Sequence, residues 1–140
     1  MMDWKIYALG SAVFAGMTAV LAKIGVKNIP SNLATLIRTF VILFFIGMLV
    51  AARQEWRNPF HLNRHSLIFL ILSGITTGLS WLCYYRALQS GPASLVTSID
   101  KFSLVFAIFF SILFLHERLN AQTWTGAILI TAGALLIALK

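Results

Sequence analysis

The chain has 140 residues, of which 59% are hydrophobic and 11% are charged, and its formal net charge is +7. Soluble domains usually carry about 25% charged residues, and one soluble domain of this length cannot enclose so much apolar surface in a single core. The composition therefore excludes a soluble domain and predicts the lipid bilayer as a partner. It also excludes a nucleic-acid-binding protein, because the basic residues lie singly at the ends of apolar runs.

The apolar runs predict an all-α membrane protein, with a single domain built as a bundle of five transmembrane helices. Each run is close to the ~20 residues that cross the hydrocarbon core. We expect helices over residues 4–23, 32–52, 66–88, 93–115 and 123–139. The first run has a lysine before it, as a signal peptide does, but its length and the spans that follow favour a helix that is retained.

Turn-forming and capping residues lie between these runs. Pro30 ends the first helix region, and Gly91-Pro92 predicts a very tight turn between the third and fourth helices. Asn120 is placed to cap the fifth. The boundaries of the helices thus agree with the apolar pattern.

Small residues at helical spacing predict close contacts between helices. They include Gly74 and Gly78 on the third helix, Gly126 and Gly133 on the fifth, and Ala12 and Gly16 on the first. The lone Cys83 excludes an internal disulfide and a paired-cysteine metal site. We read it as a small hydrophobic side chain within the bundle.

The basic residues that flank the spans are balanced between the two sides of the membrane. Lys5, Arg53, Arg57, Arg64 and Arg118 fall on the N-terminal side, and Lys23, Lys27, Arg86 and Lys140 fall on the other, where Arg38 makes the numbers equal. An imbalance is what fixes orientation under the positive-inside rule. The hypothesis is that the chain inserts in both orientations, or needs an oppositely oriented partner.

Three charged residues lie inside predicted spans: Arg38, Asp100 and Lys101. At ~1.5 Å per residue they are about 9–12 Å deep, at matching heights, so an Arg38–Asp100 pair between helices is geometrically allowed. Charges at this depth usually face a bundle interior or a water-filled cavity. We favour a polar pathway with a substrate or ion site over the alternative, a packing ion pair with Lys101 reaching toward the interface.

Two further sets of residues accompany these charges. Ser103 and Ser111 share a helix face with Asp100, which indicates either a polar stripe along the pathway or ordinary helix contacts. Trp81 and Tyr85 form an aromatic cluster, for which interfacial anchoring is favoured over a box for a cationic ligand. We expect no enzyme activity, cofactor or metal, because His61, His65 and His116 lack metal spacing and no catalytic grouping is present.

Two stretches of the chain resemble the EamA-type members of the drug/metabolite transporter superfamily. They are YRALQSGPASLV at residues 85–96 and FLHERL at residues 114–119, the second followed by Gly126 and Gly133; Arg38 early in the second helix also fits. The resemblance implies a secondary carrier of metabolites, often an exporter. It also implies that Glu117 and Gly91-Pro92 are structural, holding helix junctions.

The usual EamA-type chain has ten helices in two inverted five-helix repeats, and this chain resembles one repeat alone. Inverted repeats surround a midplane site in many carriers, so a single repeat would rebuild that site as an antiparallel homodimer, in line with the charge balance. Asp100-Lys101 departs from most of the family and resembles a short, five-helix bacterial and archaeal branch.

The function expected from these features is a secondary transporter of small metabolites or drugs in the cytoplasmic (inner) membrane. Its substrate is not indicated, and a proton or ion could couple through Asp100 or Lys101, which can change charge when buried. The alternatives are a non-transporting assembly or regulatory subunit and a component of a flippase for a lipid-linked substrate.

Overall fold

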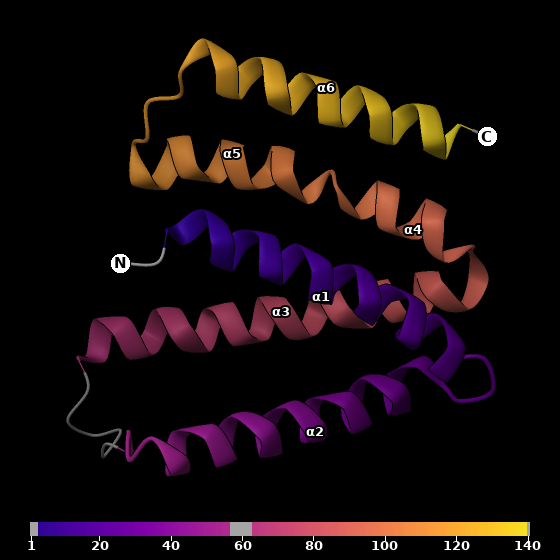
Figure 1. The fold of residues 1–140 in the computed structure, drawn as a ribbon, viewed down its shortest axis with the longest axis vertical. Helices are drawn as coiled ribbons and strands as arrows, with labels where there is room; N and C mark the ends of the chain where they lie inside the picture. The colour runs from indigo at the N-terminus through magenta and orange to yellow at the C-terminus, as the bar shows by residue number, and fades with distance from the viewer. Residues whose placement is uncertain (1–2, 57–62, 140) are drawn as a thin grey trace. The chain divides into compact units, whose positions relative to one another are not determined.

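The computed structural model describes residues 3–56 and 63–139, and within these ranges the chain is helical (Figure 1). The helices are α1 (Trp4–Gly25), α2 (Ser31–Ala52), α3 (Arg64–Ser90), α4 (Ala93–Asp100), α5 (Ser103–Leu115) and α6 (Ala121–Ala138). Arg57, His61 and Lys140, which entered the sequence predictions, lie outside the described residues.

Five stretches of the described residues are long and apolar enough to cross a membrane, with α4 and α5 together forming one of them. The predicted all-α fold with five spans is confirmed at this level. A bilayer accepts only structures whose backbone polar groups are paired internally, and a helix pairs them within the segment. The hydrocarbon core of the bilayer therefore accounts for both the apolar side chains and the helical backbone of these spans.

The helix ends follow the residues that the sequence singled out. Pro30 and Pro92 precede α2 and α4 in an extended conformation, and their carbonyls accept the first helical bonds, from Ala34 (3.0 Å) and Val96 (3.1 Å). The Asn120 side chain accepts a bond from the Thr123 amide at 2.8 Å, which confirms the predicted cap of α6.

The fourth span differs from the predicted continuous helix, because it is interrupted at Lys101 and Phe102. There the amides of Lys101 and Phe102 bond to the carbonyls three residues earlier, Ser98 (3.1 Å) and Ile99 (3.0 Å), which is the 3₁₀ pattern. Both residues keep helix-like dihedrals, so the chain tightens for one turn without leaving the span. The interruption falls directly after Asp100.

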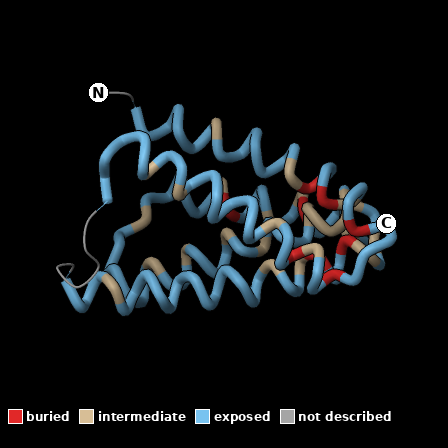
Figure 2. The backbone as a smooth tube through the Cα atoms, turned by 90° about the horizontal axis from the view of Figure 1, so that it is seen from below, coloured by how far each residue is buried: buried red, intermediate tan, exposed pale blue. Residues whose placement is uncertain are grey.

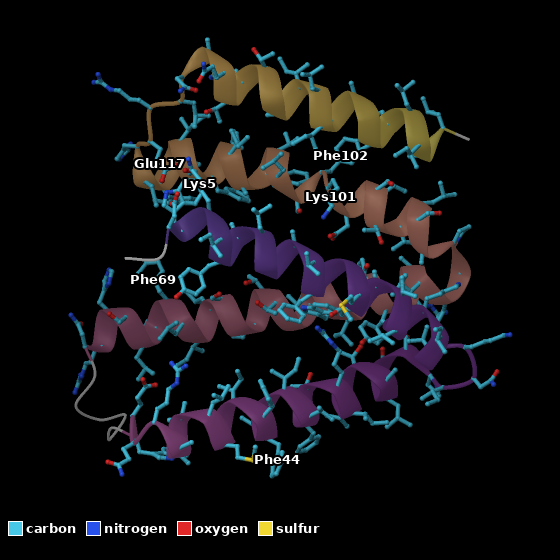
Figure 3. The ribbon with its side chains drawn as sticks, in the orientation of Figure 1. Lys5, Phe44, Phe69, Lys101, Phe102 and Glu117 are labelled. Atoms are coloured by element: carbon cyan, nitrogen blue, oxygen red, sulfur yellow. The ribbon has the colours of Figure 1, made fainter. Side chains whose placement is uncertain are left out.

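The chain forms two compact units, one of Met1–Val20 with Ser90–Lys140 and the other of Leu21–Gln89. In the first, α6 lies beside α4 and α5; in the second, α2 and α3 run antiparallel side by side (Figure 1). In every helix except α4, most described residues are exposed (Figure 2). Phe44, which points away from α3 and is 73% exposed, is typical (Figure 3). Such surfaces suit contact with lipid.

The small residues predicted to mediate helix contacts have open space around them. A methyl group added at Gly74, Gly78, Gly126 or Gly133 would meet no atom of the described residues within 4 Å. Within the described residues, no other helix therefore packs closely against these glycines. The predicted close approach stays a prediction.

Candidate functional site

In the second unit, the arginine within the membrane is stacked on an aromatic ring. The Arg38 guanidinium carbon lies 3.3 Å from the centroid of the Trp81 ring and 6.0 Å from that of Tyr85. The two rings are themselves 5.8 Å apart. A guanidinium at this distance is attracted by the negative face of the ring, most strongly where water is excluded.

The stack is built by the antiparallel pairing of α2 and α3. Arg38 comes seven residues after α2 begins at Ser31, and Trp81 comes nine residues before α3 ends at Ser90. At ~1.5 Å per residue both lie about 10–14 Å from the same end of the pair. The structure thus brings three of the predicted site residues close together: Arg38, Trp81 and Tyr85. Their arrangement differs from simple interfacial anchoring, because the aromatic face holds a cation.

Polar contacts at the same end of the second unit hold the end of α1 and the loop after it to α3. The Lys23 ammonium donates to the Leu88 carbonyl, and the Gln89 amide donates to the carbonyls of Val26 (3.3 Å) and Ile29 (2.7 Å). Leu88 and Val26 are fully buried. This small core fixes the end of α3 that carries the aromatic rings.

In the first unit, Lys101 lines a cavity of about 370 Å³ between α1 and α4. The other lining residues include Gly16 and Ala19 from α1 and Ser94, Thr97 and Ser98 from α4. Lys101 and Phe102 leave the α4–α5 junction on different sides, with Phe102 toward α6 (Figure 3). The interruption of the span thus separates a lysine on the cavity side from an aromatic residue on the packing side.

The remaining residues of the predicted polar stripe have separate environments. Asp100 ends α4 and Ser103 begins α5, one on each side of the interruption. The Ser111 hydroxyl donates to the Glu117 carboxylate, next to His116, which ends α5 in the left-handed conformation (φ 54°). Ser111 and Glu117 thus close the loop that Figure 3 shows after α5. Glu117 lies in the loop between α5 and α6, and its role as a structural residue of the helix junction stays a prediction.

Sequence reasoning missed the polar face of α4. Ser94, Thr97, Ser98 and Lys101 recur at intervals of three, four and seven residues, which places them on one helix face. That spacing can be read from the sequence. It lies on the N-terminal side of Lys101, whereas Ser103 and Ser111 of the predicted stripe lie on the C-terminal side. Arg38 and Asp100 belong to different units, and their pairing stays a prediction.

The first unit also has an apolar groove of about 470 Å³ between α5 and α6. Its lining includes Phe109, Ile112, Trp124, Ile128 and Leu135, with Thr131 as a polar member. The Thr131 hydroxyl donates to the Ala127 carbonyl of its own helix at 2.7 Å, so the groove presents an apolar surface. Such a surface suits contact with a lipid chain or another helix, and its lining residues include no charged group that could bind a polar ligand.

These features define an integral membrane protein of α-helices, with charged residues inside its spans. The EamA-like transporter family matches residues 2–139 of the chain. The chain is 50% identical over 136 residues to the uncharacterized transporter in the cobO 3′ region of Sinorhizobium sp., covering 97% of this chain and 96% of that protein. The chain therefore belongs to the EamA-like transporter family.

A more distant relative occurs in an archaeon. The uncharacterized protein MJ1333.1 of Methanocaldococcus jannaschii is 27% identical over 137 residues, which cover 96% of each chain. Both relatives thus align along nearly their whole lengths with this one. No solved structure is detectably similar.

Proposed function

We propose that this transporter is a secondary carrier of small metabolites, and that export is its direction. The interruption of the fourth span beside Asp100 and Lys101 is the observation that carries the proposal. Interrupted helices with ionisable residues near the membrane midplane form substrate and ion sites in many carriers. A charge within a span costs several kcal/mol, and a purely packing helix needs neither the charges nor the interruption.

The proposed pathway residues of the first unit are Asp100, Lys101 and Ser103, at the interruption of the fourth span, and that of the second unit is Arg38. Arg38 is held by Trp81 and Tyr85, and a guanidinium stacked by its face still has N–H donors along its edge. It can therefore keep its place in the span while it binds an anionic group. Asp100 provides the group that takes up and releases a proton during coupled transport.

The carrier acts as an antiparallel homodimer in the cytoplasmic membrane. Its flanking basic residues are balanced between the two sides, and its length corresponds to one inverted repeat. Gly74 and Gly78 are open to a second helix on the α3 surface, where small residues allow close approach. C-terminal reporters active only inside or only outside the cell test this arrangement, and both are expected to give signal.

Transport is tested in vesicles that contain purified protein and a pooled extract of labelled small metabolites. An imposed pH gradient should release a subset of them through the wild-type protein, and Asp100→Asn should abolish that release. The matched control is Asp3→Asn, the same chemical change outside the spans, which should leave release intact. Release through Asp100→Asn at the wild-type rate would remove Asp100 from the mechanism.

A non-transporting subunit is the competing function. It would give no release with either protein and would copurify with a different chain. The two functions are therefore separated by the same vesicle experiment.

A further inference from the structure

The cluster of Arg38, Trp81 and Tyr85 presents hydrogen-bond donors that have no partner in their unit. Within the described residues of that unit, none of the three side chains makes a hydrogen bond. A guanidinium has five N–H donors and no acceptor, an indole has one N–H, and a phenol adds one O–H. The cluster therefore offers donors from all three side chains, and a group that accepts hydrogen bonds complements it.

These donors are open to a ligand. Among the described residues that are not exposed, every fully enclosed side-chain nitrogen or oxygen has a hydrogen-bond partner. The donor atoms of Arg38, Trp81 and Tyr85 have none in their unit, so each keeps some open surface. Tyr85 is otherwise only 4% exposed, and a hydroxyl in such a position is costly to leave without a bond. A ligand at this opening would satisfy a group that the described protein leaves unpaired.

The guanidinium stays within the span instead of extending toward the membrane surface. The Cα atom of Trp81 lies about 13–14 Å from the shared end of α2 and α3, and long side chains lean toward the N-terminus of their helix. For α3 that direction leads away from the shared end. Because the guanidinium carbon is 3.3 Å from the centroid of the Trp81 ring, Arg38 holds its charge at that depth. A charge held there needs a counter-ion.

The second unit provides no carboxylate near this arginine. Glu55 is the one acidic residue described in the unit, and it follows the far end of α2. At ~1.5 Å per residue, its separation from Arg38 along the helix is about 25 Å. The counter-ion therefore comes from outside the unit, and a carboxylate can be supplied by a ligand or by Asp100 of the first unit.

The charge at this depth is that of a single cation. The other described basic residues of the unit lie in a loop or within about 6 Å of a helix end: Lys23, Lys27, Arg53, Arg64 and Arg86. A monoanion therefore leaves the site neutral, whereas a dianion such as a phosphate ester would leave a negative charge in the span. Because an unpaired charge there is unfavourable, the site favours a carboxylate.

We infer that the cluster of Arg38, Trp81 and Tyr85 is the binding site for the carboxylate group of a small monocarboxylate. The edge of the guanidinium donates to both carboxylate oxygens, as arginine does in bidentate pairs. The Tyr85 ring centroid is 6.0 Å from the guanidinium carbon, so one carboxylate can also accept from the Tyr85 hydroxyl. Trp81 covers the face of the guanidinium and leaves its edge to the ligand. The inference rests on the proposed transport function, since it names the class of substrate for that carrier.

The test measures binding to the cluster without transport. The triple variant Trp4→Phe, Trp56→Phe and Trp124→Phe keeps Trp81 as its single tryptophan and is reconstituted in phosphatidylcholine vesicles. Two quenchers of indole fluorescence are compared at constant ionic strength: trichloroacetate and trichloroethanol. They carry the same trichloromethyl group, on a carboxylate and on a neutral alcohol.

Trichloroacetate should quench Trp81 along a saturating curve, whereas trichloroethanol should quench in proportion to its concentration. Propionate, which does not quench, should displace trichloroacetate, and its neutral isostere propanamide should not. Methyl phosphate is a dianion at about pH 8, because the second pKa of a phosphate ester is ~6. It should displace trichloroacetate only at concentrations at least about tenfold higher than propionate needs.

Substitutions within the cluster assign the binding to its side chains. Arg38→Gln should abolish the saturating component, and Arg38→Lys should weaken it, because an ammonium keeps the charge but not the planar fork. Tyr85→Phe keeps the ring and should raise the half-saturating concentration about fivefold through the loss of one hydrogen bond. Arg53→Gln, at the other end of α2, is the matched control and should change nothing. Size-exclusion profiles and circular dichroism that match the parent protein show that each variant is folded.

Several results would overturn the inference. They are saturating quenching that survives Arg38→Gln, equal saturation by trichloroethanol, and displacement by methyl phosphate at the concentrations at which propionate acts. Saturation that appears only after Asp100→Asn would also overturn it, because Asp100 would then be the anion at Arg38. Loss of saturation in phosphatidylglycerol vesicles at high salt, which screens the surface charge, would assign the cluster to a lipid phosphate and remove the monocarboxylate.

The site and the transport function can fail separately. An absence of saturating quenching, together with release that depends on Asp100 in the vesicle experiment, would refute this site and leave the proposed carrier. Saturating quenching without any release would leave the site and refute the carrier.

Discussion

The stack of Arg38 on Trp81 gives a prediction whose size follows from the geometry. A guanidinium 3.3 Å from a ring centroid should gain about 2 kcal/mol from the ring where the surroundings exclude water. The perturbation is a double-mutant cycle with Arg38→Met and Trp81→Leu, which remove the charge and the aromatic face while keeping apolar bulk. We expect the two substitutions to couple by about 2 kcal/mol.

The matched control is the same cycle with Tyr85→Leu. The Tyr85 ring centroid lies 6.0 Å from the guanidinium carbon, at the limit of the interaction, and its coupling should be about 0.5 kcal/mol. The assay is reversible unfolding in mixed detergent micelles, followed by far-ultraviolet circular dichroism. Additivity of Arg38→Met and Trp81→Leu within about 0.5 kcal/mol, or equal coupling to both rings, would refute the cation–π account of this arginine.

Three other substitutions test the local structure in the same unfolding assay. Asn120→Ala should cost about 1 kcal/mol because the Thr123 amide loses its cap, and Asn120→Asp should restore most of it. Lys23→Met should cost about 2 kcal/mol because the buried carbonyl of Leu88 loses a charged donor, and an undiminished stability would show that this contact is not maintained. Leu88→Ala should cost about 2–3 kcal/mol at a fully buried position, whereas Phe44→Leu on the exposed surface should change stability by less than about 0.5 kcal/mol.

The sequence predicted the number of spans well because hydrophobicity over about 20 residues is a strong and additive signal. Pro30, Pro92 and Asn120 then placed helix ends, since each acts through its own backbone or side chain. These features depend on local chemistry alone, and local chemistry can be read from the chain.

The interruption at Lys101 and Phe102 could not be predicted in the same way. Neither residue is a glycine or a proline, and both keep right-handed helical dihedrals. The change is a shift of hydrogen bonds from the fourth to the third preceding carbonyl, which costs little and leaves no trace in composition. The resemblance to a transporter family located the unusual Asp100-Lys101 pair but gave no reason to expect a break there.

The contact of Arg38 with Trp81 was within reach of sequence reasoning. Both residues were already candidates, and their distances from the shared end of α2 and α3 match. The sequence allowed an ion pair of Arg38 with Asp100, whereas in the structure the face of the Trp81 ring stabilises part of the charge of Arg38. Side-chain rotamers, which decide between such partners, depend on tertiary packing.

The position of the single cysteine, Cys83, makes it a marker of depth in the membrane. Cys83 is exposed and lies seven residues before the end of α3, about 10 Å below that end. A nitroxide on this thiol would occupy one depth in every protomer of a parallel pair. In an antiparallel pair the two nitroxides would lie in opposite leaflets, about 10 Å apart along the membrane normal if the core is about 30 Å thick. The native chain therefore carries an internal marker of leaflet position, and its orientation can be measured without a fusion at either terminus.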